Sequence, residues 1–474
     1  MGILYPPGMV RVFVAGMGAV SPLGNTWEDT KQALYAGKSG ITTFNDRFDP
    51  HSLDVYNERE IELDGIKVVV LVPAKASLEH IANAAGLVKN FQLDDHIDQP
   101  AARKWKIYFD ISAQYTLAAA VEAMGSVPGF LEKYLCLNPK EREHYADDLG
   151  VYIGTGQGGI STWEKGYLRF MHKGNVLRLD PKYIPGLMAN SPTCVVADAL
   201  GARGGGDGAV GACAGGLIGL KNGYLAVKHG YQPWALGGGV EAPITPNTVA
   251  HFAMMQALAK PNYDSPEEAS RPYDKGRSGF VIAEGAAVVL FVSEEKVKEL
   301  GLPVLAEVIG FGSSFDAYSQ FSPDPKGKGM ELALERTIYN ARRFIGIGKE
   351  DIGIINPHGT STELNDKYES QAIRRVMGVY ADNVVITPTK GATGHMVAGT
   401  SALEFAIMVD NIATGRVPPS LNLNEPDVEN GCDLNYAGPK TVDKDVPVAV
   451  TLSYAFGGIN LGMAVKRVDK LGLK

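Results

Sequence analysis

The 474-residue sequence contains no hydrophobic run long enough to cross a membrane and no run of basic residues. A membrane-spanning helix needs about 20 predominantly apolar residues, so no span is expected. Lys and Arg number 45 against 53 Asp and Glu, giving a formal net charge of −8. This acidic balance argues against nucleic acid as a partner. The first residues also lack the charged and then apolar order of a secretory signal peptide.

Cysteine is scarce, with four widely spaced residues: Cys136, Cys194, Cys213 and Cys432. Their spacing matches neither a CxxC metal site nor the disulfide framework of a secreted protein. We therefore expect a protein of a reducing compartment, with a cytoplasmic location, whose cysteines are either buried or reactive. Cys136, in a charged segment, and Cys194, in an apolar helix, are expected to be buried and structural.

Glycine, in contrast, is abundant at 56 residues, or 11.8% of the chain, against a typical usage of about 7%. Fourteen of these glycines fall within residues 201–240, so the excess has a location. Strands alternate with helices along the chain, which predicts an α/β architecture. Residues 10–18 and 304–312 both run from a strand into a Gly-x-Gly turn, which favours two related halves that divide near residue 300.

The motif Gly154-Thr-Gly-Gln-Gly-Gly159 follows a strand-like run and fits the GxGxxG pattern of dinucleotide-binding proteins. However, the nearest acid at a suitable distance, Asp180, precedes a proline and does not end a second strand, as the ribose-binding acid should. A tight turn beside a packed surface is therefore favoured, and a nucleotide-binding dehydrogenase stays as an alternative.

Cys213 is the strongest candidate for a nucleophile. It follows a strand-like segment, and a helix of small residues begins directly behind it. Unpaired N–H groups and the helix dipole at such a position favour the thiolate. The small neighbours Ala212 and Ala214 leave the sulfur accessible and free the Cys213 N–H for an oxyanion. This context favours a reactive cysteine over a buried structural one.

Two of the nine histidines stand in similar strand-to-glycine turns. His358 follows an apolar strand, and His395 lies in a glycine-rich turn after Lys390, with Glu404 nine residues further along a helix. Neither histidine has an HExxH partner or other metal-ligand spacing, so no metal site is expected. Near the C-terminus, the turn Phe456-Gly-Gly would point a backbone N–H into a site, although a simple hairpin explains it equally well.

In their order along the chain, these segments resemble the β-ketoacyl-acyl-carrier-protein synthases, the elongating condensing enzymes of the thiolase superfamily. The segments that carry the resemblance are Gly16-Met-Gly-Ala-Val-Ser-Pro-Leu-Gly24, Ala212-Cys-Ala214, Gly237-Gly-Gly-Val-Glu-Ala242, Arg271-Pro-Tyr-Asp-Lys-Gly-Arg-Ser-Gly-Phe280, His358-Gly-Thr-Ser-Thr362, Lys390-Gly-Ala-Thr-Gly-His395 and Phe456-Gly-Gly458. Each is weak alone, but together they are specific and cover nearly the whole chain except residues 50–84.

The resemblance implies a five-layered αβαβα thiolase fold of two similar halves, residues 1–300 and 301–474, with an insertion at about 50–84, and usually a homodimer. Cys213 would take an acyl group from the phosphopantetheine of an acyl carrier protein. His358 and His395 would then promote decarboxylation of malonyl-carrier protein and stabilise the enolate that attacks the acyl-cysteine. No metal or nucleotide cofactor takes part in this reaction.

The resemblance also assigns roles to residues around the proposed nucleophile. These are the oxyanion-hole N–H groups of Cys213 and Phe456, the latter also a gate; the pair Lys390 and Glu404; the supporting acids Asp366 and Glu369; and the pantetheine contacts Thr360 and Thr362.

The chain departs from the family pattern where substrates are held. Gln157 stands where an apolar residue usually limits acyl-chain length, and Phe321 replaces a threonine that often contacts pantetheine. These changes predict an unusual or partly polar acyl substrate. One alternative is a thiolase that uses acetyl-CoA, which would need a second catalytic cysteine, and Cys432 lies in a loop without such a motif. Another is an accessory subunit of the chain-length-factor type, which the presence of Cys213 argues against.

Overall fold

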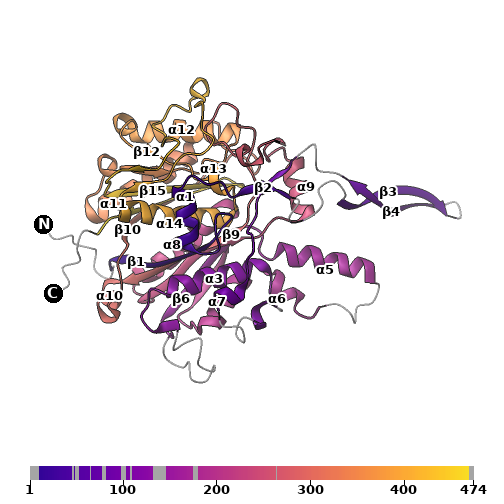
Figure 1. Cartoon of the computed structure of the whole chain (residues 1–474), viewed down its shortest axis with the longest axis horizontal. Helices are drawn as coiled ribbons and strands as arrows, with labels where there is room; N and C mark the ends of the chain where they lie inside the picture. Colours follow the sequence, from indigo (N-terminus) through magenta and orange to yellow (C-terminus); the bar gives the residue numbers. More distant parts are fainter. Residues whose placement is uncertain are drawn as a thin grey trace.

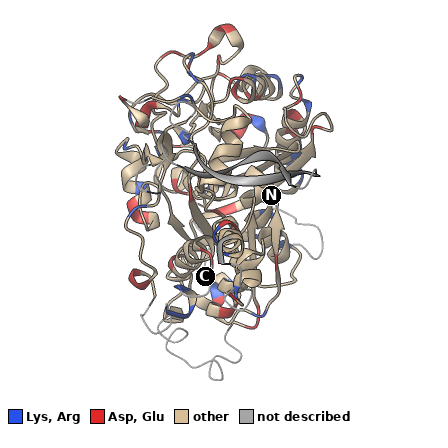
Figure 2. Cartoon of the chain, turned by 90° about the vertical axis from the view of Figure 1, so that its right-hand side faces the viewer, with Lys and Arg blue, Asp and Glu red and all other residues tan. Residues whose placement is uncertain are grey.

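The structure is a computed structural model that describes residues 10–44, 47, 53–63, 66–76, 82–97, 103–106, 109–131, 146–173, 180–262 and 264–468. Cys136 lies outside the described residues. Among the described residues, the longest and most apolar helices still fall short of what a membrane crossing requires. Acidic and basic residues are interspersed over the side of the chain seen in Figure 2.

A mixed ten-stranded sheet forms the centre of the fold. Its strands, from one edge to the other, are β12 (Val385–Ile386), β11 (Ile354–Asn356), β15 (Val448–Ala455), β16 (Ile459–Lys466), β10 (Ala306–Phe315), β1 (Val12–Val20), β9 (Gly285–Ser293), β8 (Trp234–Glu241), β6 (Leu149–Thr155) and β7 (Gly206–Val210).

The pairing pattern of this sheet reads the same from both edges. The two pairings nearest each edge are parallel, and all those between them are antiparallel. The central pair, β1 with β10, consists of the two strands that carry the similar Gly-x-Gly segments. The expectation that these glycines form turns is wrong, because both strands continue through them to Val20 and Phe315. Two related halves would produce this symmetry, and the division near residue 300 stays a prediction.

Helices cover and separate the two halves of the sheet (Figure 1). One hydrophobic core lies between β1, β6, β8 and β9 and the helices α3 (Ile111–Met124) and α7 (Ser191–Leu200). A second surrounds the central helices α8 (Gly215–Lys228) and α14 (Ala398–Thr414), which contact strands of both halves. A third lies under α11 (Lys328–Ile345) and α12 (Glu363–Met377). The predicted order of helix, sheet, helix, sheet, helix is thus observed, with the two halves of the ten-stranded sheet as the two sheet layers.

Shorter elements connect these layers. They are α1 (Trp27–Tyr35), α5 (Ile160–Lys173), α6 (Tyr183–Leu187), α9 (Pro246–Met254), α10 (Glu294–Leu300), α13 (Lys390–Thr393), and the two-stranded pairs β2 (Ile41–Thr43) with β5 (Ala84–Gly86) and β13 (Arg416–Val417) with β14 (Val442–Asp443).

The insertion at 50–84 contains a long antiparallel hairpin, β3 (Leu53–Leu63) with β4 (Ile66–Ala76). Figure 1 shows it standing away from the body of the protein, near α9. Its two strands pair with each other and with no other described strand.

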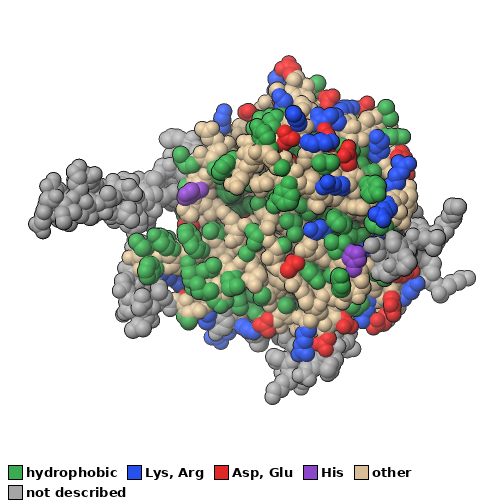
Figure 3. All heavy atoms as spheres, turned by 180° about the vertical axis from the view of Figure 1, so that it is seen from behind, with side chains coloured by type: hydrophobic (Ala, Val, Ile, Leu, Met, Phe, Trp, Pro, Cys, Tyr) green, Lys and Arg blue, Asp and Glu red, His purple; other side chains and the backbone are tan. Residues whose placement is uncertain are grey.

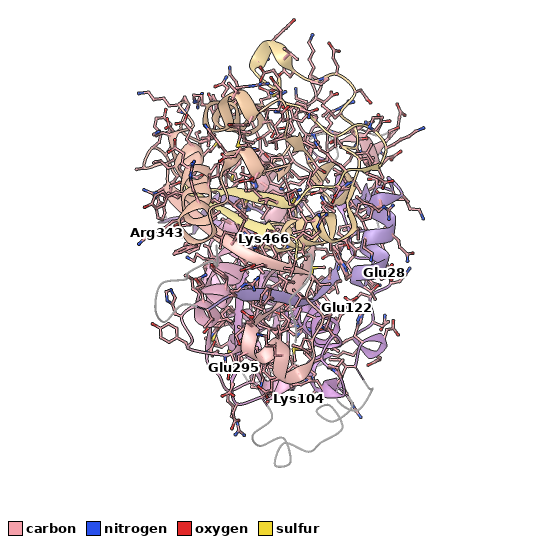
Figure 4. The ribbon with its side chains drawn as sticks, turned by 90° about the vertical axis from the view of Figure 1, so that its left-hand side faces the viewer. Glu28, Lys104, Glu122, Glu295, Arg343 and Lys466 are labelled. Atoms are coloured by element: carbon pink, nitrogen blue, oxygen red, sulfur yellow. The ribbon has the colours of Figure 1, made fainter. Side chains whose placement is uncertain are left out.

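A partly buried carboxylate fixes the start of α1. Glu122 of α3 accepts hydrogen bonds from the N–H groups of Trp27, at 2.8 and 2.9 Å, and of Ala19, at 3.0 Å. Burial raises the pKa of Glu122 to about 7. Figure 4 labels Glu122 in α3, with Glu28 of α1 nearby. One side chain therefore ties together a strand and two helices of the N-terminal half.

The glycines of residues 201–240 allow backbones to touch. A Cβ atom on Gly239 of β8 would lie 2.4 Å from the Cα of Gly216 in α8 and 2.6 Å from the carbonyl oxygen of Ala398 in α14. Such distances are below any tolerated contact, so a strand and both central helices meet here without side chains between them. The glycine excess in the sequence therefore marks close packing of the central layer.

We expect Gly239→Ala to lower the free energy of unfolding by at least about 1–3 kcal/mol, because overpacking a rigid contact forces backbones apart. Urea denaturation followed by circular dichroism measures the change. The control is Gly438→Ala, whose Cβ would meet nothing within 4 Å, and it should match the wild type. Equal stability of the two variants would contradict the packing described.

Candidate active site

Cys213 lies in a short 3-10 turn, Ala212–Ala214, between β7 and the start of α8. Cys213 is only 6% exposed. Ala212 has a φ of 45°, a left-handed conformation uncommon for a residue with a side chain. The backbone carbonyl of Cys213 accepts a hydrogen bond of 3.1 Å from the hydroxyl of Ser453 in β15. Strand, turn and helix thus hold the cysteine at the junction of the two halves.

The structure brings both predicted histidines to this cysteine. His358 follows β11, as predicted, whereas His395 follows the short helix α13, so its predicted strand-to-glycine turn is wrong; both histidines are buried. The sulfur of Cys213 and one ring nitrogen of each histidine lie within 4.8 Å of one another. The two imidazole rings have centroids 5.3 Å apart and are nearly perpendicular, at 83°. Residues far apart in the sequence therefore form one compact constellation.

Lys390 and Glu404 form the predicted ion pair behind the histidines. The Nζ of Lys390 donates to Glu404 Oε1 at 2.7 Å and also to the backbone carbonyl of His358. Both side chains are 1% exposed. Thr389 adds a hydrogen bond of 3.0 Å to the same carboxylate oxygen. The lysine therefore both neutralises a buried carboxylate and fixes the backbone at His358.

Asp366 and Glu369, on the first turns of α12, hold the loop that carries His358. Glu369 accepts the N–H groups of His358 at 2.7 Å and Gly359 at 2.8 Å. Asp366 accepts the Ser361 N–H at 3.2 Å. Gly359 and Ser361 have positive φ angles of 46° and 72°, so these hydrogen bonds maintain a loop of uncommon conformation. The two acids act on the backbone around His358.

Burial decides the protonation of the site. The pKa of both histidines lies well below 6.5, because burial and then the charge of Lys390 disfavour the imidazolium. Both are therefore neutral at pH 7. Burial also raises the pKa of Cys213 to about 12, although Lys390 and the N–H groups of Phe456 and Cys213 act in the opposite direction.

The expectation that the position of Cys213 favours the thiolate is therefore wrong for the resting site. The start of α8 does lie directly behind the cysteine, as predicted. However, burial of the sulfur raises its pKa more than Lys390 and the N–H groups of Phe456 and Cys213 lower it. At rest the nucleophile is a thiol beside two neutral imidazoles.

A cavity of about 890 Å³ leads to the constellation. Its lining includes the predicted site residues Cys213, His358, His395, Thr360, Thr362, Phe321 and Phe456. Phe456 is 36% exposed in the turn between β15 and β16. Phe321 is 73% exposed. The cavity is thus buried at the cysteine and open toward Phe321.

Gln157 does not line this cavity, and it is exposed. Its N–H donates to the buried carboxylate of Glu241 at 3.0 Å, and the N–H of Gly156 donates to the same group. Because a carboxylate already occupies these N–H groups, the turn at 154–159 does not offer them to a pyrophosphate. The dehydrogenase alternative therefore loses the feature on which it rested.

The other two described cysteines, Cys194 and Cys432, lie outside the constellation. Cys194 is exposed on α7, so its expected burial is wrong, because this position of the helix faces outward. Cys432 is buried, and neither of the two lines the cavity. Cys432 thus does not provide the second cysteine that a thiolase site needs.

Three residues of the site escaped the sequence analysis. Thr400, in the first turn of α14, has its Oγ1 3.2 Å from Nδ1 of His395. Tyr273 donates its hydroxyl to Glu369 at 2.7 Å. Tyr454, near the end of β15, lines the cavity beside His358. The sequence around these three residues contains no pattern that predicts a contact with a histidine or an acid.

Replacing Lys390 with Met should lower the free energy of unfolding by about 3–5 kcal/mol, since Glu404 is then buried without its cation. It should also raise the pKa of His358 and His395, because the lysine charge lowers both. Urea denaturation and NMR titration of the imidazoles measure the two effects. The control is Lys298→Met, which removes an exposed pair with Glu294 and should cost less than about 1 kcal/mol. Unchanged histidine pKa values would contradict the electrostatic role.

Comparison with known proteins matches this geometry to a family. The description "Beta-ketoacyl synthase, N-terminal domain" fits residues 9–296, and "Beta-ketoacyl synthase, C-terminal domain" fits residues 305–424. A 3-oxoacyl-[acyl-carrier-protein] synthase 2 of Synechocystis sp. is 33% identical over 96% of this chain and 98% of its own length. The enzyme of the same name from Coxiella burnetii is 34% identical over 97% and 99%.

Among solved structures, a type II polyketide ketosynthase in complex with its acyl-carrier protein, bound to the hexaketide, is 26% identical. The match covers 97% of this chain and 100% of that one, with a TM-score of 0.78. The ishigamide ketosynthase/chain length factor is 25% identical, with the same coverage and TM-score. The predicted thiolase fold is thereby confirmed, and the chain belongs to the β-ketoacyl synthase family.

Proposed function

We propose that this β-ketoacyl synthase transfers an acyl group to Cys213 and condenses it with malonyl-acyl-carrier protein to give a β-ketoacyl product. One observation carries the proposal: the sulfur of Cys213 and a nitrogen of each of two neutral histidines lie within 4.8 Å at the end of a cavity. A nucleophile and two hydrogen-bonding imidazoles in one enclosed site fit a two-step acyl transfer.

In the loading step, the sulfur of Cys213 attacks the thioester carbonyl of the acyl-carrier protein. A carbon–sulfur bond to Cys213 forms, and the bond to the pantetheine sulfur breaks. The thiol proton ends on the departing pantetheine sulfur, so no net proton is taken up. The N–H groups of Cys213 and Phe456, which already act on the sulfur, would hold the developing oxyanion.

In the condensation step, malonyl-carrier protein occupies the cavity and loses CO₂. The electron pair of the broken carbon–carbon bond forms an enolate, whose oxygen accepts hydrogen bonds from the His358 and His395 rings. The enolate carbon attacks the acyl-cysteine, the new carbon–carbon bond forms, and the Cys213 sulfur leaves and takes a proton from solvent. Enclosure of the site strengthens each of these hydrogen bonds.

The names of the relatives support the proposed partner, and the proposed cytoplasmic location rests on the scarcity of cysteine in the sequence. The matched enzymes are named for acyl-carrier protein, and one matched ketosynthase is in complex with its carrier. We therefore assign an acyl carrier protein as the partner, a phosphopantetheine-borne substrate with no resident metal or nucleotide cofactor, and a cytoplasmic location. Thr360 and Thr362, whose hydroxyls are 2.9 Å apart at the cavity wall, would contact the pantetheine, as would Phe321.

Only one of the two residues expected to affect acyl specificity lines the cavity. Phe321 lies in the cavity lining, whereas Gln157 does not. A partly polar acyl chain therefore stays a proposal, supported by the polar lining residues Gln256, Gln320 and Asn365. Condensation assays over acyl chains of graded length and polarity test it.

Acyl loading is the direct test of the nucleophile. Incubation with acyl-carrier protein should add one acyl group to Cys213, detected by mass spectrometry of peptides. Cys213→Ala should lose the adduct and at least about 10³-fold of the condensation rate, since removing a covalent nucleophile leaves only binding and the oxyanion hole. Cys194→Ala, which removes the exposed cysteine of α7, is the matched control and should behave as wild type.

Other outcomes separate the alternatives. Condensation by Cys213→Ala at the wild-type rate would refute the proposal. Acyl exchange with free acetyl-CoA and no release of CO₂ would indicate a thiolase. The three ligand atoms would also suit a metal ion, and loss of activity on chelation, restored by zinc, would reveal one.

A homodimer, which the family resemblance implies, is part of the proposal. Strand β7 is an edge of the ten-stranded sheet, and Val210 at its end is 59% exposed. The neighbouring helix α5 exposes Trp163 by 39% and Phe170 by 53%. Figure 3 shows hydrophobic side chains gathered low on the left of the rear face, where α5 lies. A free edge and an apolar patch of this kind usually mark an interface.

Sedimentation equilibrium should therefore show twice the mass of one chain. The double variant Trp163→Glu with Phe170→Glu should shift the protein toward the monomer, because two charges would be buried in the interface. Val379→Glu, at a position 85% exposed on another part of the surface, is the control and should leave the mass unchanged. A monomeric wild-type protein would overturn the assignment.

A further inference from the structure

Tyr454, the last residue but one of β15, presents an unpaired polar group at the active site. The residue is 5% exposed and lines the cavity. Its hydroxyl is buried and has no hydrogen-bond partner among the residues that the structure describes. Burying a hydroxyl without a partner costs free energy. Such a group in a native protein therefore needs an explanation.

The ring of His358 lies next to this tyrosine, with centroids 5.9 Å apart and planes at 66°. Nδ1 of His358 is also buried, and it too has no partner within the described part of the chain. Because His358 is neutral, one ring nitrogen carries a proton and the other is an acceptor. The partner of Nδ1 decides which nitrogen that is.

The neighbouring histidine, His395, does have a partner at its Nδ1. The Oγ1 of Thr400 lies 3.2 Å from Nδ1 of His395 and accepts the N–H of Met396 at 2.6 Å. The hydroxyl of Thr400 can therefore accept the Met396 N–H and donate its own proton to Nδ1. Donation in this direction would place the proton of His395 on Nε2, which has no partner among the described residues.

Two polar neighbours of His358 in the described structure already make hydrogen bonds to other atoms, and neither bonds to its Nδ1. Lys390 donates to the backbone carbonyl of His358 and to Glu404. Glu369 accepts the backbone N–H of His358. The pKa of Tyr454 is raised well above 10 by burial and by the charges of Glu369 and Asp316, so its hydroxyl keeps the proton it can donate.

We propose that Tyr454 is a positioning residue that sets the tautomer of His358. When the site is loaded, the hydroxyl donates to Nδ1, and the proton of the imidazole is held on Nε2. Nε2–H then donates to the thioester oxygen of the extender unit as the enolate forms. The tyrosine keeps its proton throughout. This role rests on the proposed condensation and assigns Tyr454 to the enolate step and not to the loading of Cys213.

The test replaces Tyr454 with Phe, which keeps the ring and removes the hydroxyl. We expect the turnover number for condensation to fall about tenfold, as loss of a hydrogen bond at the transition state produces. KM for malonyl-carrier protein and the rate of acyl loading on Cys213 should be unchanged. Tyr339→Phe removes the hydroxyl of an exposed tyrosine on α11 and should match the wild type.

A spectroscopic readout tests the tautomer without any need for activity. The protein is labelled with ¹⁵N-histidine and alkylated at Cys213 with iodoacetamide, which fills the place of the acyl group. The wild type should show His358 with its proton on Nε2, and Tyr454→Phe should show a mixture of both tautomers. Thr400→Val should cause the same change at His395 and so calibrates the effect.

Two results would overturn the assignment: an identical His358 spectrum and turnover in Tyr454→Phe, or an equal loss in loading and condensation, which would indicate a merely structural residue. If the wild-type protein fails to acylate Cys213 while the His358 spectrum changes as expected, the proposed function fails and the tautomer role stands.

Discussion

Direct contact between backbones in the central layer determines the rest of this structure. Gly239 of β8, Gly216 of α8 and the start of α14 meet with no side chain between them. Cys213 precedes α8 by two residues, and His395 precedes α14 by three. Separating these helices by the width of one methyl group would therefore move the nucleophile away from a histidine. The glycines of residues 201–240 therefore allow the close packing that aligns the two parts of the site.

The site is assembled from buried polar groups, so its chemistry depends on which of them neutralise one another. Lys390 forms an ion pair with Glu404. Glu369 and Asp366 accept hydrogen bonds from backbone N–H groups around His358. The imidazoles stay uncharged and the sulfur stays protonated. Burial thus disfavours the charged forms of the cysteine and the two histidines, while the N–H groups of Cys213 and Phe456 remain directed at the sulfur.

The sequence was informative where chemistry requires particular residue types in a particular local setting. A cysteine before a glycine-rich helix and two histidines in glycine-containing turns predicted Cys213, His358 and His395, and the structure brings the three together. Only His358 follows a strand, since the short helix α13 precedes His395. The layered α/β fold followed from alternating strands and helices. The properties that could not be predicted depend on residues that are distant in the sequence and close in the fold. The protonation of Cys213 is set by enclosure, the outward position of Gln157 by the turn that Glu241 holds, and the roles of Thr400 and Tyr454 by neighbours distant in the chain.

The small pair β2 with β5 bears on how the projecting hairpin relates to the enzyme. Ile41 pairs with Gly86 and Thr43 with Ala84, so the chain leaves the body and returns to it at adjacent points that the fold itself joins. The hairpin of β3 and β4 is therefore a topological detour, whereas Phe44, Arg47 and Asn83 beside β2 and β5 still contact the body of the protein. A segment of that kind can lengthen, shorten or vanish over generations while the catalytic layers keep their register. Because β3 and β4 pair only with each other among the described strands, changes confined to the hairpin would leave the pairing of the catalytic layers intact.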